Sequence, residues 1–145
     1  MTAWPDLAGR IEGGHHILPV RVYFEDTDFS GLAYHGSFVR WCERGRSDWL
    51  RLLGVHHSEL AAGAEPAAFV VRKLTIDYLK PARIDEVLEV VSSRTELTTA
   101  TLTLAQAVRR AGVVLAKAEV LVVLVSGKGR PMRLPARVRQ VFGGG

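Results

Sequence analysis

Apolar and polar positions follow two different periods along this chain, and the change of period divides it into elements. Residues 17–24 alternate and are rich in β-branched and aromatic side chains, which predicts a strand. Between residues 35 and 53 the apolar positions recur every three or four residues, which predicts a helix with one buried face. These positions are Phe38, Trp41, Cys42, Gly45, Trp49, Leu52 and Leu53. Gly54 then follows where a glycine commonly ends a helix.

The second half of the chain has the pattern of strands. Four long segments are rich in β-branched and apolar residues, namely 68–79, 86–96, 99–109 and 113–125. Glycine-containing turns at 110–112 and 126–129 end the last two of them. A short helix is expected from Ser58 to Ala62 with Ser58 as its N-cap, and a helical turn at 135–142. One strand, one long helix and four consecutive strands predict an α+β fold with an antiparallel five-stranded sheet.

Length and composition are those of a single domain. The chain has 145 residues, of which 48% are hydrophobic and 23% charged. We expect one domain over residues 16–142, preceded by a loose polar arm over residues 1–15. No stretch reaches the roughly 18 apolar residues that cross a bilayer, so no integral membrane segment is expected. The start of the chain lacks the regions of a signal peptide, and the single Cys42 fits a reducing compartment, so we expect a cytoplasmic protein.

The charge balance favours an anionic partner. The formal net charge is +4 and the sequence pI is about 9.6. Nucleic acid, a phosphorylated cofactor such as coenzyme A, an acidic carrier protein and an anionic membrane surface all fit this charge. Basic and aromatic side chains do not interleave as they do in RNA-binding proteins, so we expect no nucleic-acid partner.

Two carboxylates, Asp26 and Asp28, lie in a turn-forming segment directly before the predicted long helix. Gly31 follows in the turn, and His35 comes seven residues after Asp28. The first N–H groups of a helix have no intrahelical partner and carry a partial positive charge. A carboxylate held near them can act on a carbonyl group that these amides polarise. The segment therefore predicts an active-site loop.

Two metal-dependent interpretations of this segment fail. Residues 26–31 begin like a calcium-binding EF-hand loop, but Ser37 stands at position twelve, where a bidentate glutamate is required. An aspartate-based phosphohydrolase would need further acidic ligands and an α/β sheet, and the strand-rich remainder of the chain offers neither. We therefore expect no metal site.

Residues 26–46, DTDFSGLAYHGSFVRWCERGR, resemble the signature of the 4-hydroxybenzoyl-CoA thioesterase family of hotdog proteins. The matching positions are Asp26, Asp28, Gly31, Tyr34, His35, Phe38, Trp41, Glu43, Gly45 and Arg46. Residues 74–90, LTIDYLKPARIDEVLEV, resemble a second segment of that family. The E-D-T-D and Y-H forms are similar to those of the acyl-CoA thioesterases linked with the Tol–Pal system. The resemblance covers residues 18–125 and implies a hotdog fold, in which a five-stranded sheet wraps around one long central helix.

The resemblance implies that the protein hydrolyses the thioester bond of an acyl-CoA. Coenzyme A is then part of the substrate, and no other cofactor is expected. Asp28 matches the family's catalytic acid, as nucleophile or as general base toward water. His35 matches the residue whose backbone N–H polarises the carbonyl, and its imidazole could also orient water or protonate the departing thiolate. A non-catalytic protein that binds acyl-CoA or acyl carrier protein is the alternative, because a fold does not determine a function.

Further residues are candidates for binding the substrate. They are Gly31 and Tyr34 near the pantetheine arm, Glu43 on the helix, and Arg72, Lys73, Lys128, Arg130 and Arg133 for the phosphates. Each of them except Tyr34 has a structural alternative: a turn for Gly31, solvated charges for the basic residues, and for Glu43 an ion pair with Arg46 or Arg40, which is favoured. For Asp26, a turn or cap role is favoured over a second catalytic acid.

The acyl group is expected in an apolar pocket along the helix, with Phe38, Trp41 and residues 69–71 as candidate lining, although core packing suits Trp41 better. Core packing is also expected for Cys42, and a surface or cap position for His56 and His57. An open sheet edge can be covered by a second copy, which predicts a homodimer, and the resemblance suggests a dimer of dimers. The site would then take residues from both copies.

Overall fold

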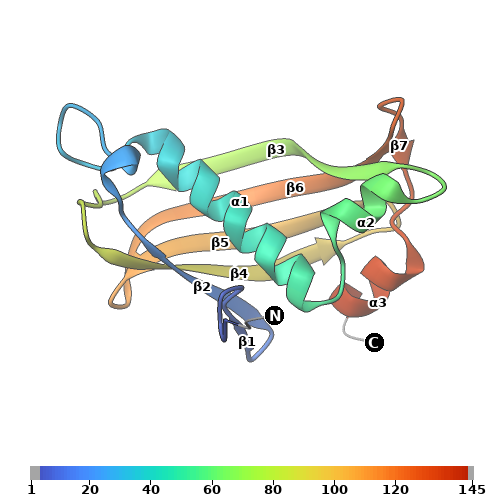
Figure 1. Cartoon of the computed structure of the whole chain (residues 1–145), viewed down its shortest axis with the longest axis horizontal. Coiled ribbons are helices and arrows are strands. Elements are labelled where there is room, and N and C mark those ends of the chain that lie inside the picture. Colours follow the sequence, from blue (N-terminus) through green and yellow to red (C-terminus); the bar gives the residue numbers. More distant parts are fainter. Residues whose placement is uncertain (1–3, 144–145) are drawn as a thin grey trace.

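One antiparallel sheet organises the molecule, and helix α1 (His35–Leu52) lies across one of its faces (Figure 1). The structure is a computed structural model and describes residues 4–143. Along the sheet the strands follow the order β1-β2-β4-β5-β6-β3, and β7 pairs with β6. The strands are β1 (Arg10–Glu12), β2 (His15–Arg21), β3 (Ala67–Tyr78), β4 (Val87–Leu97), β5 (Thr101–Arg110), β6 (Val113–Ser126) and β7 (Pro131–Met132).

Three short helical segments complete the described chain. They are the 3-10 helix η1 (Phe24–Asp26), α2 (His57–Ala62) and α3 (Ala136–Gly143). None of the helices within residues 4–143 is both long and apolar enough to cross a membrane.

The α+β hotdog fold expected from the sequence is confirmed, with two additional short strands, β1 and β7. The first long strand ends at Arg21 rather than at residue 24, because the 3-10 helix η1 begins at Phe24. The N-cap of α2 is His56, so the assignment of Ser58 as N-cap is wrong. The expected loose arm is wrong for residues 10–12, because β1 pairs with β2. Residues 1–3 of that expected arm lie outside the described residues.

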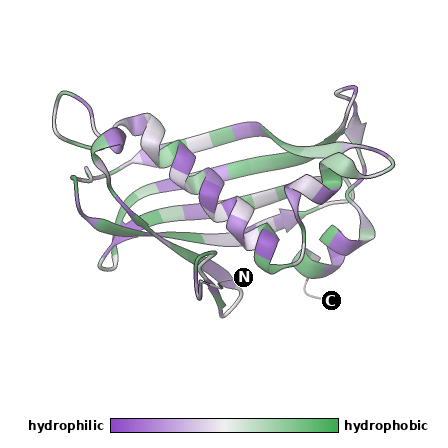
Figure 2. Ribbon diagram, viewed as in Figure 1, coloured by the Kyte–Doolittle hydropathy of each residue, from purple (hydrophilic) through white to green (hydrophobic). Residues whose placement is uncertain are grey.

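The buried face of α1 follows the predicted period. Phe38, Trp41, Cys42, Gly45 and Trp49 are buried against the sheet, and the strands beneath α1 are largely hydrophobic in Figure 2. At the last turn the prediction fails: Leu52 is 44% exposed, and its neighbour Leu50 is buried instead. Leu50 faces the pocket under the helix.

Close packing and a polar anchor together hold α1 on the sheet. A Cβ atom added to Gly45 would lie only 2.8 Å from Cγ1 of Val90, so glycine is needed for this approach to β4. Beside it, the Gln106 side-chain amide donates to the Cys42 carbonyl (2.9 Å) and to the Ser92 hydroxyl (2.9 Å). The Gln106 carbonyl oxygen accepts from Arg46 (3.0 Å). The contacts fix the position of α1 along its axis.

Strand β3 forms one edge of the sheet. It pairs with β6, and its other edge has no neighbour within the described residues. Apolar residues on it are nonetheless exposed, including Val70, Val71 and Tyr78 at 39–44%. The pairing with β6 shifts register between Val71 and Lys73, which places a bulge at Arg72 in the middle of this edge. An exposed apolar strand edge is a surface on which another chain can pair.

Candidate active site

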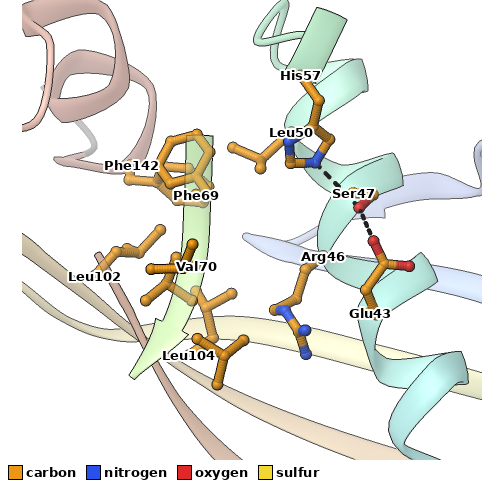
Figure 3. Close-up of a pocket in the computed structure, with 12 residues that line it drawn as sticks. Glu43, Arg46, Ser47, Leu50, His57, Phe69, Val70, Leu102, Leu104 and Phe142 are labelled. Atoms are coloured by element: carbon orange, nitrogen blue, oxygen red, sulfur yellow. Dashed lines mark hydrogen bonds between the residues drawn. The ribbon is translucent and has the colours of Figure 1, made fainter. Parts of the chain in front are cut away.

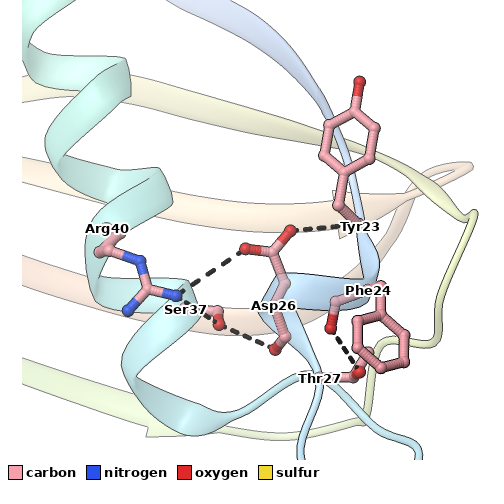
Figure 4. Close-up of polar contacts among 6 residues, drawn as sticks. All are labelled: Tyr23, Phe24, Asp26, Thr27, Ser37 and Arg40. Carbon is pink, nitrogen blue, oxygen red and sulfur yellow. Dashed lines mark hydrogen bonds and ion pairs between the residues drawn. The ribbon is translucent and has the colours of Figure 1, made fainter.

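The segment between β2 and α1 is fastened to the start of the helix through Asp26. The Asp26 carbonyl accepts hydrogen bonds from the Tyr34 amide (2.8 Å) and from the Ser37 hydroxyl (2.9 Å), the second of which is drawn in Figure 4. The Asp26 carboxylate accepts from the Tyr23 amide (2.9 Å) and lies 3.8 Å from the Arg40 guanidinium. Asp26 is 4% exposed, so it has the supporting role favoured by the sequence. The loop that follows is therefore held in a fixed place.

Asp28 lies on the exposed part of this loop. Its Oδ1 accepts from the Ser30 amide (2.8 Å) and the Ser30 hydroxyl (2.5 Å). These bonds, the hydroxyl first, lower the pKa of the Asp28 carboxyl below its ordinary value, and His35 makes a smaller contribution in the same direction. Among the described residues, nothing binds Oδ2. Asp28 is thus an ionised carboxylate with one oxygen available.

His35 is the first residue of α1, and its backbone N–H group is a free donor. No side chain caps the helix at Tyr34. The Tyr34 amide donates to Asp26 and the Ser37 amide to the Tyr34 carbonyl (2.8 Å), whereas no acceptor for the His35 or Gly36 amide lies within residues 4–143. Two adjacent amides at the positive end of the helix dipole are therefore unpaired, and His35 is close enough to Asp28 to lower the pKa of its carboxyl.

The remaining predicted residues lie in three other places. Glu43 lies eight residues beyond His35, about 12 Å along the helix axis. Arg72 and Lys73 lie in the middle of the open edge of β3. Lys128, Arg130 and Arg133 surround β7, at the opposite end of the sheet from the Asp28 loop (Figure 1). Within one chain the structure brings together Asp28, Gly31, Tyr34 and His35, but not the basic residues assigned to the phosphates.

A pocket of about 130 Å³ lies between the second half of α1 and the sheet (Figure 3). Its polar residues come mainly from α1, and its apolar residues come from the strands and α3, together with Leu50 of α1. The lining residues are Glu43, Arg46, Ser47, Leu50, His57, Phe69, Val70, Val71, Leu102, Leu104, Val122 and Phe142. The predicted lining by residues 69–71 thus agrees with the structure. Phe38 and Trp41 lie in the core and do not line it.

The polar side of this pocket was not foreseen. Glu43 forms no ion pair with Arg40 or Arg46 in the part of the chain that the structure describes, so the favoured ion pair is wrong. Its carboxylate instead accepts a hydrogen bond from the Ser47 hydroxyl (2.8 Å), and His57 Nε2 lies 3.1 Å from the Oγ atom of Ser47 (Figure 3). Because Ser47 has a single proton, His57 must be the donor in the second bond.

His57 is exposed at the surface, as expected, and it also lines the pocket because α2 folds back beside α1. Its ring lies 6.1 Å from that of Phe69, edge to face. The pattern of the sequence carries no signal for the contact between Ser47 and His57, which are ten positions apart and lie on two different helices.

Two other groups can be assigned from their surroundings. Burial raises the pKa of the Cys42 thiol to about 11, so this cysteine is a neutral core residue at ordinary pH and not a nucleophile. No group of three or more histidine, cysteine or acidic side chains within residues 4–143 is arranged to hold a metal ion.

A single antiparallel sheet packed on one long central helix is the hotdog fold. A family model described as the Thioesterase superfamily matches residues 30–117, and the chain belongs to this family. The family expected from the sequence motifs is thereby confirmed.

Named relatives extend over almost the whole chain. The acyl-CoA thioester hydrolase YbgC of Escherichia coli O6:H1 is 44% identical over 126 residues, which span 86% of this chain and 92% of that protein. The acyl-CoA thioesterase YbgC of Haemophilus influenzae is 38% identical with the same coverage. Among solved structures, a probable thioesterase from Bartonella henselae superimposes with a TM-score of 0.82 at 37% identity, covering 83% of this chain and 99% of that one.

Proposed function

We propose that this protein hydrolyses acyl-CoA thioesters to a free acid and coenzyme A, at the loop that carries Asp28. The observation that supports this most directly is an ionised Asp28 with one free oxygen near the unpaired amides of His35 and Gly36. The relatives named acyl-CoA thioester hydrolases, 38–44% identical over most of the chain, support the same reaction.

The catalytic step follows from these groups. The thioester carbonyl oxygen accepts a hydrogen bond from the His35 amide, which stabilises the negative charge that develops on this oxygen. Asp28 then either attacks the carbonyl carbon, forming a mixed anhydride that water hydrolyses, or removes a proton from an attacking water. In both routes the carbon–sulfur bond breaks and the thiolate leaves. In this proposal the His35 imidazole supplies a proton to the thiolate or orients the water.

A homodimer would complete this site. If two copies join at the open edges of β3 about a two-fold axis perpendicular to the sheet, the two strands run antiparallel. The Tyr78 end of one copy, next to its own His35 carbonyl, then lies beside the Ala67 end of the other. These two ends are roughly 36 Å apart within one strand, and the pairing brings them together across the interface.

The dimer gives a place to each group of predicted substrate-binding residues. The pocket and the residues Lys128, Arg130 and Arg133 belong to the Ala67 end of the sheet. We propose that one copy supplies the Asp28 loop, while the other supplies the pocket for the acyl group and the basic side chains for the phosphates. Arg72 and Lys73 lie in the middle of β3, which favours contacts across the interface. We propose that the protein is a cytoplasmic dimer of dimers. Coenzyme A is part of the substrate, and the reaction needs no further cofactor. An acyl group on an acyl carrier protein is a second possible substrate.

The reaction is tested by the release of free thiol from a panel of acyl-CoAs of increasing length. We expect the parent protein to hydrolyse at least part of the panel, and Asp28→Asn to lower kcat by about a thousandfold. Asp6→Asn is the matched control, because Asp6 is exposed and lies far from α1 in the sequence.

The outcomes separate the two functions. Equal hydrolysis by Asp28→Asn and the parent would exclude Asp28 from the mechanism. If the parent binds acyl-CoA and cleaves none, the non-catalytic alternative holds.

A further inference from the structure

The hydroxyl group of Tyr78 reaches the first peptide of α1 from another element. Tyr78 is the last residue of β3, and its hydroxyl donates a hydrogen bond to the His35 carbonyl at 2.9 Å. The ring is placed by edge-to-face contacts with Phe38 (5.5 Å between centroids) and His35 (6.2 Å). The sheet therefore holds this hydroxyl against the helix start.

The bond acts on the amide of the next residue. The His35 carbonyl and the Gly36 N–H belong to one planar trans peptide, in which the two groups point in opposite directions. Fixing the direction of the carbonyl therefore fixes the direction of the Gly36 N–H. A hydrogen bond accepted by the carbonyl also polarises the N–H of the same peptide, by an amount on the order of 10–30%.

Gly36 is suited to serve as a donor. Its amide has no acceptor within residues 4–143. A Cβ atom at this position would lie 2.7 Å from Cε2 of Tyr34, so the Tyr34 ring takes its present place because residue 36 has no side chain. The Tyr34 ring in turn lies 4.2 Å from the His35 ring. The His35–Gly36 peptide is thus held between the ring of Tyr34 and the hydroxyl of Tyr78.

We propose that Tyr78 is a positioning residue for thioester hydrolysis, and that the peptide it holds supplies the Gly36 N–H as a second donor to the reacting carbonyl oxygen. This inference rests on the proposed function. It adds the Gly36 N–H as a second donor beside the His35 amide and makes this second donor depend on a side chain of the sheet. Burial raises the pKa of Tyr78, so its hydroxyl keeps the proton that it donates.

The substitution Tyr78→Phe removes the hydroxyl and keeps the ring contacts. We expect kcat to fall about tenfold while KM stays within about twofold, because the donor acts in the transition state more than in the ground state. The amide proton resonance of Gly36 is expected to move upfield in the NMR spectrum of Tyr78→Phe, since the polarising bond is lost. The control is Tyr23→Phe, because Tyr23 is 57% exposed and its hydroxyl makes no hydrogen bond within the described residues.

The two readouts distinguish this role from a purely structural one. A general loss of packing would lower the melting temperature and raise KM, without a selective change at Gly36. If Tyr78→Phe retains the parent kcat while Asp28→Asn is inactive, the inference is wrong and the proposed function stands. A parent protein that cleaves no thioester would overturn both.

Discussion

The two ends of α1 differ in how their polar groups are satisfied. At the start of the helix, one Asp28 oxygen and the amides of His35 and Gly36 have no partner among the described residues. Toward its end, the polar groups beside the pocket bind one another, as Glu43, Ser47 and His57 do. The first end is prepared to act on another molecule, whereas the second end closes an apolar space.

The difference supports the proposal that the reaction takes place at one end of α1 and that the acyl group is bound at the other. Free donors and a free carboxylate oxygen can stabilise charge that appears during a reaction. An apolar pocket with satisfied polar groups contributes affinity for an apolar group instead. The pocket begins about 12 Å along α1 from His35, so the loop and the pocket of one chain do not adjoin. The proposed pairing of β3 edges joins the loop of one copy to the pocket of the other.

The largest expected effect comes from mixing two inactive variants. Asp28→Asn removes the acid and leaves the pocket, whereas Ser47→Phe fills the pocket from α1 and leaves the loop. If loop and pocket come from different copies, half of the randomly mixed dimers contain one intact site out of two. The mixture is then expected to recover about one quarter of the parent activity, from two variants that each have below about 1%.

The control for this mixture is the double variant, in which both changes are on one chain, mixed with the parent. The recovery is measured as thiol release after the variants have been unfolded and refolded together, so that copies exchange. A mixture that stays as inactive as its components would show that loop and pocket of the same chain act together.

Much of the fold was predictable, because the spacing of apolar residues along the sequence indicates which segments form strands and which form helices. The five long strands and α1 were found within a few residues of their ends, because buried positions recur at periods of two and 3.6. The short strands β1 and β7 were missed, as three and two residues are too few to show a period. Leu52 was misplaced because the pattern does not tell where the pocket interrupts the contact between helix and sheet.

The site was predictable only where it is continuous in sequence. Residues 26–36 carry a motif, so Asp28 and His35 could be named from the sequence. The contact between Ser47 and His57 depends on how α2 turns back, and that between Tyr78 and His35 on how β3 ends beside α1. The ion pair of Glu43 with Arg40 or Arg46 was a wrong prediction because Ser47, four residues on, binds its carboxylate instead.

A smaller effect is expected at the pocket end from Phe142→Ala. The Phe142 ring lines the pocket and contacts Trp49 edge to face at 5.1 Å. Removing it should lengthen the acyl chain with the highest kcat/KM and should cost about 3–5 kcal/mol of stability. The measurement is the kcat/KM of each acyl-CoA in the panel, with Phe142→Leu as the conservative control. An unchanged chain-length preference would show that the acyl group does not reach this part of the pocket.

The smallest expected effect concerns the acid limb of the pH profile at the loop end. Two hydrogen bonds from Ser30 lower the pKa of Asp28, so the carboxylate stays ionised, and the enzyme active, below the ordinary pKa of an aspartate. Activity is lost as the pH falls through this lowered pKa. Ser30→Ala removes the hydroxyl, which is the larger cause, so the pKa rises and the acid limb of kcat/KM moves to higher pH. The plateau at neutral pH should change little, because Asp28 is ionised there in both proteins.

Ser58→Ala on the exposed surface of α2 serves as the matched control. An acid limb that does not move in Ser30→Ala would mean that a group other than Asp28 controls it.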